Sequence, residues 1–217
     1  MGGVTHQRRD APEPLSGPIH ERVGTVWEAK PEAVDVIRRA LVLLSDHELN
    51  PSTFSVRVCA STGASLPATL LAGMSTLSGP GHGGVTELAN AALKAANGGK
   101  ITEFLAETAD LTPYAFGFGH PLYSAGDPRA VALLNHISKD APARRAVSTL
   151  SGRLSLPPNI DAALAVAAAH FKWPNDAAAI LFSIGRTAGW IAHAIEQVRS
   201  GDMIRPRAKY QTNQNAI

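Results

Sequence analysis

Two histidines lie in glycine-rich loops of a kind that often binds ligands. His82 lies within Gly79–Gly84, directly before a helical pattern, and glycines there allow the backbone to approach a ligand closely. A histidine at a helix entrance experiences the positive end of the helix dipole, which favours a neutral imidazole able to donate a hydrogen bond to a developing oxyanion. His120 lies in a second such loop, Gly117–Tyr123. Because one histidine among glycines is a weak signal, a turn with a surface histidine remains the alternative interpretation of the first loop.

Three arginines and one aspartate are further candidates for binding or proton transfer. Arg129 follows an Asp-Pro pair that is typical of a helix start, whereas Arg186 and Arg205 have apolar or turn-like neighbours. Arginine binds carboxylates through two parallel hydrogen bonds. Arg129 can also be a surface helix residue. Asp161 begins an apolar helical pattern, where its carboxylate is either an anion at the helix N-terminus, the favoured interpretation by itself, or a partly buried base with a raised pKa.

The sequence predicts no metal site. Cys59 is the single cysteine, and the His-Glu pair at 47–48 lacks the second histidine of a zinc-binding helix. Structural or surface roles are expected for the histidines within helical patterns, which are His136, His170 and His193.

The segments that must position these side chains have helical periodicity. Apolar residues repeat at spacings of three and four from Pro31 to a predicted end near His47. Similar patterns, separated by Gly, Pro and Asn, predict further helices at about 65–77, 85–97, 101–109, 128–138, 143–154, 160–171 and 176–199. The sequence therefore predicts an all-α protein.

Two of the helical segments need separate argument. Apolar residues alternate over 54–59, which periodicity alone assigns to a strand, but Asn50 and Pro51 favour a helix over 51–61. In the last helix, with Asp176 as its expected cap, one face is predicted to be apolar and the other to carry three polar residues. The predicted apolar face comprises Ile180, Ile184, Thr187, Ile191, Ile195 and Val198, and the polar residues are Arg186, His193 and Glu196.

Composition excludes several classes of protein. A length of 217 residues is enough for about one to one and a half domains with a sizeable core. A net charge of +2 with 18% charged residues gives no basic surface for nucleic acid. One cysteine, no apolar leader and a longest apolar run of Ala162–Ala169 predict a soluble, cytoplasmic protein without a membrane span. Residues 1–20, polar and proline-rich, are predicted to be a disordered tail.

Read together, six segments of the chain resemble the citrate synthase family, in the family's order. They are Asp46–Phe54, Gly79–Gly84, Gly117–Tyr123 with Asp127–Ala130, Pro158–Asp161, Ile184–His193 and Arg205–Arg207. The resemblance covers about residues 21–210 and corresponds to the carboxyl-terminal half of an ordinary member. The chain departs from the family pattern at Gly81, Val85–Glu87 and Pro121, and none of these is an expected catalytic group.

The resemblance implies three catalytic residues. His82 looks like the donor to the thioester oxygen of acetyl-CoA as the enol forms, and Asp161 like the base that takes a methyl proton. His120 looks like the residue that polarises the ketone of oxaloacetate.

The resemblance also implies binding residues. Oxaloacetate would be bound by His47, Arg129 and Arg186, and Arg205 matches an arginine that reaches into the partner subunit's site. Coenzyme A would lie against a loop formed by Gly117, Phe118 and Gly119.

The function implied is citrate synthase-type acyl transfer, in which acetyl-CoA, oxaloacetate and water give citrate and CoA. CoA would be a cosubstrate, with no permanently bound cofactor and no metal. The same residues would serve 2-methylcitrate synthesis from propionyl-CoA or cleavage of citryl-CoA. A non-catalytic or half-enzyme subunit that needs a partner chain is the remaining alternative.

The expected architecture has two lobes with the active cleft between them. Residues 21–82 and 190–217 would form a remnant of the family's large domain, and 83–189 its small domain. Because the amino-terminal half of the family pattern is absent, apolar faces within 31–77 would be exposed unless a partner covers them. A homodimer, or pairing with a second family-like chain, is therefore expected.

Overall fold

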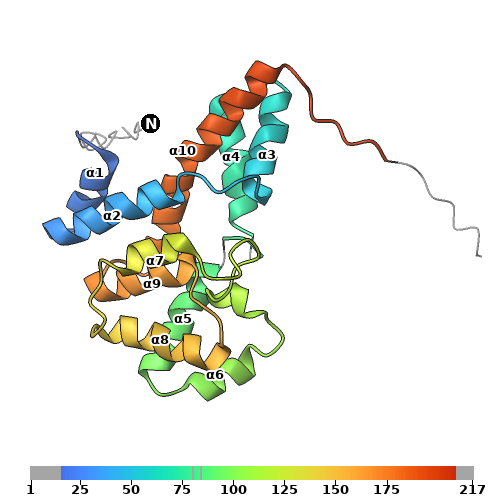
Figure 1. Cartoon of the computed structure of the whole chain (residues 1–217). Helices are drawn as coiled ribbons and strands as arrows, with labels where there is room; N and C mark the ends of the chain where they lie inside the picture. The colour runs from blue at the N-terminus through green and yellow to red at the C-terminus, as the bar shows by residue number, and fades with distance from the viewer. Residues whose placement is uncertain (1–15, 80, 84, 209–217) are drawn as a thin grey trace, which may run out of the picture.

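The computed structural model describes residues 16–79, 81–83 and 85–208, and in these residues the chain is helical without a strand (Figure 1). The helices are α1 (Ile19–Val26), α2 (Pro31–Leu44), α3 (Pro51–Ser61), α4 (Leu66–Leu77), α5 (Val85–Asn97), α6 (Ile101–Glu107), the 3₁₀ helix η1 (Pro113–Phe116), α7 (Pro128–Leu134), α8 (Pro142–Leu154), α9 (Ile160–Phe171) and α10 (Ala177–Ser200). The all-α prediction is confirmed, and α3 replaces the strand that alternation alone would assign.

Side-chain caps explain where some of these helices begin. The Oδ1 atom of Asn50 accepts a hydrogen bond from the Thr53 amide at 3.0 Å, at the start of α3. Asn159 caps α9 in the same way, accepting from the Asp161 amide at 3.0 Å. Asp176 precedes α10 as predicted but makes no side-chain cap bond.

Several boundaries differ from the sequence prediction, and α7, predicted to extend to about residue 138, ends at Leu134. Helix α2 ends at Leu44, so His47 lies in the segment that connects α2 to α3 and not at a helix end. Residues 1–15 of the predicted tail lie outside the described residues. Helix α1 begins at Ile19, which is within the predicted tail of residues 1–20. Helix α1 has few apolar residues, and it is held by packing on α2 and by contact of Trp27 with Trp173, whose ring centroids are 5.4 Å apart.

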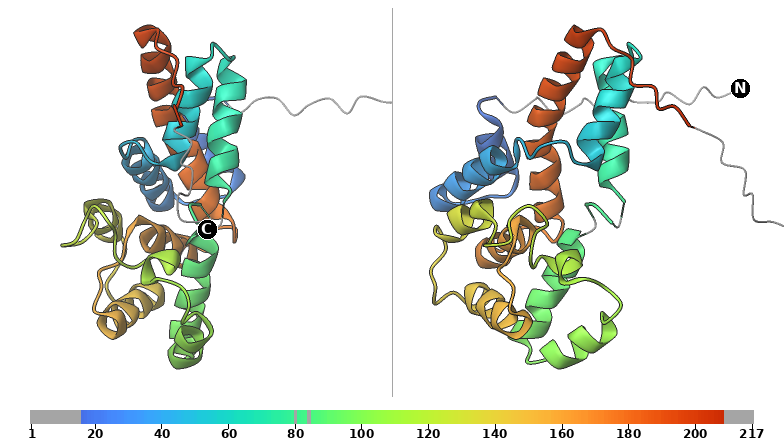
Figure 2. Two further views of the ribbon diagram at one scale, coloured as in Figure 1. Left: turned by 90° about the vertical axis from the view of Figure 1, so that its right-hand side faces the viewer. Right: turned by 45° about the vertical axis from the view of Figure 1, so that its right-hand side comes forward.

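The helices gather into two groups joined by α10 (Figures 1 and 2). Helices α3 and α4 lie beside the carboxyl-terminal part of α10, and α5–α9 lie at its other end. A small apolar cluster around Trp190 holds the first group together, while the larger cluster joins α2 to α5–α9. Segment 21–82 therefore contributes to both clusters. The division into two lobes at residues 82 and 190 stays a prediction.

The buried face of α10 is not the predicted one. Ile195 and Val198 are 46% and 60% exposed, whereas Gly185 and Gly189 are buried against the end of α2. A Cβ atom on Gly185 would lie 2.8 Å from the Cβ atom of Leu44. The two glycines allow the backbones of α10 and α2 to approach closely. Helix α10 therefore buries the face that carries Gly185 and Gly189, and the end of the predicted face with Ile195 and Val198 is exposed.

Replacing Gly189 with alanine is expected to lower the free energy of unfolding by about 1–3 kcal/mol. The added Cβ atom would overlap the carbonyl oxygen of Ser45. The matched control is Gly152→Ala in α8, where nothing lies within 4 Å of the added atom, so helix propensity should leave stability equal or higher. Urea denaturation measures both variants, and equal stabilities would contradict the close approach of α10 to α2.

Among the described helices, α10 alone is long and apolar enough to cross a membrane, judged by length and composition only. In this structure 39% of its most apolar window is buried, and it packs on α2, α3 and α4. Its apolar composition is accounted for in part by these contacts.

Candidate active site

A cavity of about 260 Å³ brings together five of the predicted site residues. They are His47, His82, His120, Arg129 and Asp161. The other lining residues are Glu48, Leu49, Asn50, Pro51, Tyr114, Pro121, Leu122, Ile160 and Phe182. The cavity is thus built from segments that lie more than a hundred residues apart in the sequence.

His82 is held by a serine that the sequence analysis did not single out. Its Nε2 atom lies 3.0 Å from the Oγ atom of Ser52. This hydroxyl accepts from the indole N–H of Trp190 at 3.3 Å and donates to Oδ1 of Asn50 at 2.8 Å. Burial, with a smaller contribution from the charge of Arg186, lowers the pKa of His82. The imidazole is therefore neutral near pH 7, as the helix-entrance argument also required.

The geometry of His120 fixes which of its nitrogens carries the proton. Its Nδ1 atom accepts a hydrogen bond from the Leu122 amide at 3.1 Å. Burial first, and then the charge of Arg129, lower the pKa of His120. A neutral ring whose Nδ1 atom is an acceptor carries its proton on Nε2, so this nitrogen can donate to a ligand.

His47 offers an unused polar atom in the same cavity. Its ring packs edge-on against that of His120, with centroids 5.0 Å apart. Burial, followed by the charge of Arg129, lowers the pKa of His47 to about 4. Its Nε2 atom is buried and has no hydrogen-bond partner among the described residues. Buried polar atoms are usually satisfied, so this atom indicates a place for a ligand.

Arg129 and Asp127 form a buried ion pair beneath the cavity. The Oδ2 atom of Asp127 accepts from Nη2 of Arg129 at 2.8 Å and from the Ile160 amide at 3.0 Å, and its Oδ1 atom accepts from Nε of Arg129 at 3.0 Å. The sequence predicted Asp127 as a helix cap only. It also fixes the guanidinium, which lies 5.6 Å from the centroid of the Tyr123 ring.

Asp161 is 8% exposed and lies at the first turn of α9. Burial raises its pKa to about 6, although the charge of Arg129 acts in the opposite direction. The carboxylate is therefore buried and has a raised pKa, as one of the two interpretations expected, and its role as a base stays a prediction.

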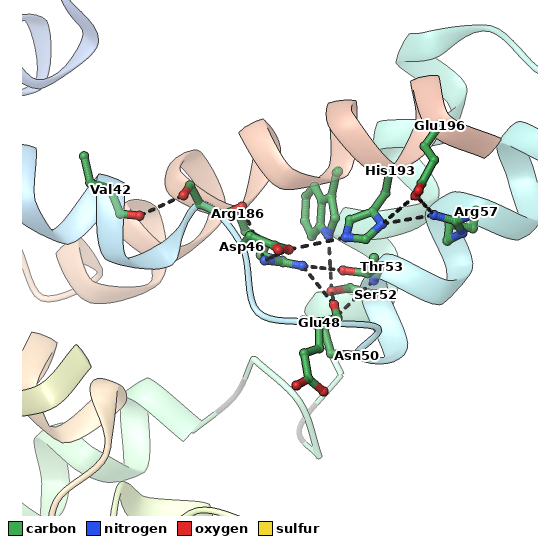
Figure 3. A network of polar contacts seen from close by, with 12 residues as sticks. Val42, Asp46, Glu48, Asn50, Ser52, Thr53, Arg57, Arg186, His193 and Glu196 are labelled. Carbon is green, nitrogen blue, oxygen red and sulfur yellow. Dashed lines mark hydrogen bonds and ion pairs between the residues drawn. The ribbon is translucent and has the colours of Figure 1, made fainter. Parts of the chain in front are cut away.

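Arg186 lies against the segment that connects α2 to α3, where it contacts the carbonyl oxygens of Ser45 and Glu48 (Figure 3). Its side chain is 1% exposed, and Nη2 donates to Oγ1 of Thr53 at 2.6 Å. Nη1 contacts the carboxylate of Asp46 at 3.3 Å. Its Nε atom is buried without a partner among the residues that the structure describes. This arginine is therefore adjacent to the cavity without lining it.

The remaining predicted binding residues lie outside the lining of the cavity. Gly117 has a φ angle of +98°, and its carbonyl accepts from the Asn159 amide at 2.9 Å, so this turn supports the start of α9. The Phe118 side chain is buried in the core. Arg205 is exposed in the segment that follows α10. Roles for Gly117, Phe118 and Gly119 toward CoA, and for Arg205 toward a partner, stay predictions.

Across the described ranges, no three His, Cys, Asp or Glu side chains are placed to hold a metal ion. The cavity lining offers a buried carboxylate that can accept a proton, two neutral histidines that can donate hydrogen bonds, and Arg129, which can bind a carboxylate.

Comparison with known proteins identifies the family. The sequence profile "Citrate synthase, C-terminal domain" matches residues 4–207. The chain belongs to the citrate synthase family. It is 32% identical over 203 residues to "Citrate synthase 2" of Bacillus subtilis, which covers 84% of this chain and 52% of that protein. It is also 28% identical over 183 residues to "2-methylcitrate synthase 1" of Corynebacterium glutamicum, covering 79% of this chain and 48% of that protein.

Solved structures of the family share the fold. Citrate synthase from Thermotoga maritima superposes with a TM-score of 0.75 at 28% identity, covering 90% of this chain and 57% of that one. The citrate synthase of Thermoplasma acidophilum, solved as a ternary complex with carboxymethyl coenzyme A and oxaloacetate, superposes with a TM-score of 0.74 at 26% identity, covering 94% and 59%. The citrate synthase-like fold is confirmed, and the chain spans about half the length of the curated relatives it matches.

Proposed function

We propose that this chain supplies the active-site residues of a citrate synthase-type acyltransferase, which condenses acetyl-CoA with oxaloacetate and water to give citrate and CoA. The observation that carries the proposal is the cavity in which Asp161, with a raised pKa, faces the neutral histidines His82 and His120. Membership of the family supports the same reaction.

The proposed reaction uses each group in the protonation state favoured by its surroundings. The Asp161 carboxylate takes a proton from the methyl group of acetyl-CoA while His82 donates a hydrogen bond to the thioester oxygen. The enolate carbon then forms a bond to the ketone carbon of oxaloacetate while the carbon–oxygen π bond of the ketone breaks. The resulting alkoxide takes the proton on Nε2 of His120 to become the hydroxyl of citrate, and the proton held by Asp161 balances this loss. Water hydrolyses the resulting citryl thioester, which releases citrate and the CoA thiol.

We assign the binding of oxaloacetate to two arginines and to a histidine nitrogen that has no hydrogen-bond partner among the described residues. The two carboxylates of oxaloacetate would be held by Arg129 and Arg186, and the unpartnered Nε2 atom of His47 would face the same molecule. Fixing the ketone beside the enol removes part of the entropic barrier to condensation. Ser52 donates its single hydroxyl proton to Oδ1 of Asn50 at 2.8 Å in this structure. In the proposed reaction the hydroxyl would turn that proton to Nε2 of His82, at 3.0 Å, which leaves the ring proton on Nδ1.

The first test is the oxaloacetate-dependent release of CoA thiol from acetyl-CoA by the 217-residue chain. The His82→Ala variant is the control. Release by the wild type and not by the variant supports the proposal. Calorimetric titration with oxaloacetate distinguishes the alternatives: binding without release favours a subunit that needs a partner chain, and absence of both from a folded chain contradicts the assignment.

The acyl group is a separate question, because a 2-methylcitrate synthase is among the relatives. Propionyl-CoA in place of acetyl-CoA would give 2-methylcitrate with the same residues, and citryl-CoA cleavage would run the condensation in reverse. Thiol release with each acyl-CoA, and consumption of added citryl-CoA, decide among the three reactions.

Association with a second chain is part of the proposal, either as a homodimer or with another family-like chain. Apolar side chains are exposed on the group formed by α3, α4 and α10, including Phe54, Leu71, Met74, Ile195 and Val198. An exposed apolar surface of this kind favours association. We place the protein in the cytoplasm, with the cavity between two lobes, 21–82 with 190–217 and 83–189. Light scattering of the purified chain measures its mass.

Replacing Arg186 with alanine is expected to weaken oxaloacetate binding roughly 10- to 100-fold, because a charge-assisted hydrogen bond is lost. Calorimetric titration measures the affinity, and circular dichroism checks the fold. Arg199→Ala, an exposed arginine near the end of the same helix, is the matched control and should bind like the wild type. An unchanged affinity in folded Arg186→Ala would remove this arginine from the proposed site.

A further inference from the structure

A chain of polar contacts on α3 and α10 is not used by the proposed reaction (Figure 3). Nη1 of Arg57 contacts the carboxylate of Glu196 and lies 3.2 Å from Nδ1 of His193. On the other side of the ring, Nε2 of His193 lies 3.3 Å from Oδ1 of Asp46. The same Oδ1 atom accepts from Nη1 of Arg186 at 3.3 Å. The contacts thus run without interruption from Arg57 to Arg186.

The contacts with Arg57 and with Asp46 select the same tautomer of His193. A guanidinium has five N–H donors and no acceptor, so Nδ1 of His193 must accept and the ring proton must lie on Nε2. Glu196 does not compete for a proton on Nδ1, because its Oε2 atom is 3.8 Å away. The Nε2–H group therefore donates to Asp46.

Asp46 connects this histidine to the cavity. Burial alone would raise its pKa, but the hydrogen bond from His193 and the charge of Arg186 hold the pKa below its ordinary value. The residue lies in the segment between α2 and α3, next to His47, and its carboxylate is held by α10 at two positions, Arg186 and His193. Asp46 itself is largely exposed, so packing does not fix it. Its carboxylate is held by Arg186 and His193 on α10, together with a hydrogen bond from the backbone amide of His47.

We propose that His193 is a positioning residue, which Arg57 holds as the Nε2–H tautomer and which fixes Asp46, and through it the segment that carries His47 and the guanidinium of Arg186. The statement that this fixed geometry serves oxaloacetate rests on the proposed function. Arg57 and His193 touch neither the cavity nor a reacting atom in this scheme. Their contribution is the orientation of groups that would bind the substrate.

Two substitutions of His193 separate the two ends of its ring. The amide of glutamine overlays the Nε2 position, so His193→Gln keeps a donor to Asp46 and loses the acceptor for Arg57. The amide of asparagine overlays the Nδ1 position, so His193→Asn keeps an acceptor for Arg57 and loses the donor to Asp46. We expect His193→Asn to bind oxaloacetate about 10-fold more weakly, and His193→Gln to stay within about threefold of the wild type.

Nitrogen-15 NMR of the unliganded full chain tests the positioning without relying on activity. The wild type should show Nδ1 of His193 unprotonated and Nε2 protonated, and the Nη protons of Arg186 should give separate signals because its guanidinium rotates slowly. His193→Asn should merge these signals, whereas His193→Gln should preserve them. Arg57→Leu should lower the share of the Nε2–H tautomer of His193, which the Asp46 carboxylate alone still favours because it can only accept.

Matched controls lie outside the chain of contacts. His170→Asn removes an exposed histidine near the end of α9, and Arg38→Leu removes an exposed arginine that pairs with Asp35 within α2. Neither should change the NMR signals of His193 and Arg186 or the affinity for oxaloacetate.

The outcomes for the two proposals are distinguishable. Failure of the wild type to bind oxaloacetate contradicts the proposed function, and the NMR measurements still decide the role of His193. A proton on Nδ1 of wild-type His193, or Arg186 signals that are the same in His193→Asn and the wild type, would overturn the inference.

Discussion

Asp161→Asn is expected to slow the release of CoA thiol roughly 10²- to 10⁴-fold while oxaloacetate binding stays near that of the wild type. An asparagine amide has nearly the size of the carboxylate but cannot accept the methyl proton. Steady-state thiol release measures the rate, and calorimetry measures the affinity. The measurement uses the chain alone where it is active, or the chain with its partner where a partner is required.

The matched control is Asp176→Asn, an exposed aspartate directly before α10 and outside the cavity. It should leave both quantities unchanged. Equal losses of rate and of affinity in Asp161→Asn would assign a structural role to Asp161, because removal of a proton acceptor should affect the rate selectively.

The pH dependence of the wild-type rate is a second test of Asp161 as the base. Because burial raises the pKa of Asp161 to about 6, half of the base is protonated at that pH. Only the ionised form can accept a proton, so the rate should rise with pH through about 6 and level off above it. A rate already constant between pH 5 and 7 would show that Asp161 is not the titrating base.

Local sequence signals predicted most of the helices, and they marked five of the fourteen residues that line the cavity. Asn50 with Pro51, and Asn159 before Asp161, specify helix starts through hydrogen bonds between near neighbours in the chain. Such signals can be recognised in the sequence because the two residues joined by each capping hydrogen bond lie within one helical turn. The glycine-rich loops likewise marked His82 and His120, and the structure brings both histidines to the cavity.

The contacts that the sequence did not reveal join distant segments. In the sequence, Ser52 looks like an ordinary residue in the first turn of a helix. It contacts His82 and Trp190 because α4 and α10 pack against α3 in the fold. The buried face of α10 was mispredicted for the same reason, since Gly185 contacts α2, more than a hundred residues away. Periodicity describes one helix, whereas the partner decides which of its faces is buried.

Asp127→Asn is expected to lower the free energy of unfolding by about 3–5 kcal/mol at pH 7, because it leaves the buried charge of Arg129 without its partner. The carboxylate accepts hydrogen bonds from Arg129 and from the Ile160 amide at the start of α9. An amide N–H₂ group facing these donors cannot accept from them. Urea denaturation measures the loss, and Asp110→Asn, an exposed aspartate, is the control that should match the wild type.

The pH dependence of this loss follows from the sign of the pKa shift. Burial alone would raise the pKa of Asp127, but the hydrogen bonds and charge of Arg129 hold it below the ordinary value. The carboxylate therefore stabilises the fold fully above the unfolded pKa of about 4, and this contribution is lost as the pH falls through the lower folded pKa. The difference in stability between wild type and Asp127→Asn should shrink below pH 4. A difference that is constant down to pH 2 would mean that the variant loses packing and not an ion pair.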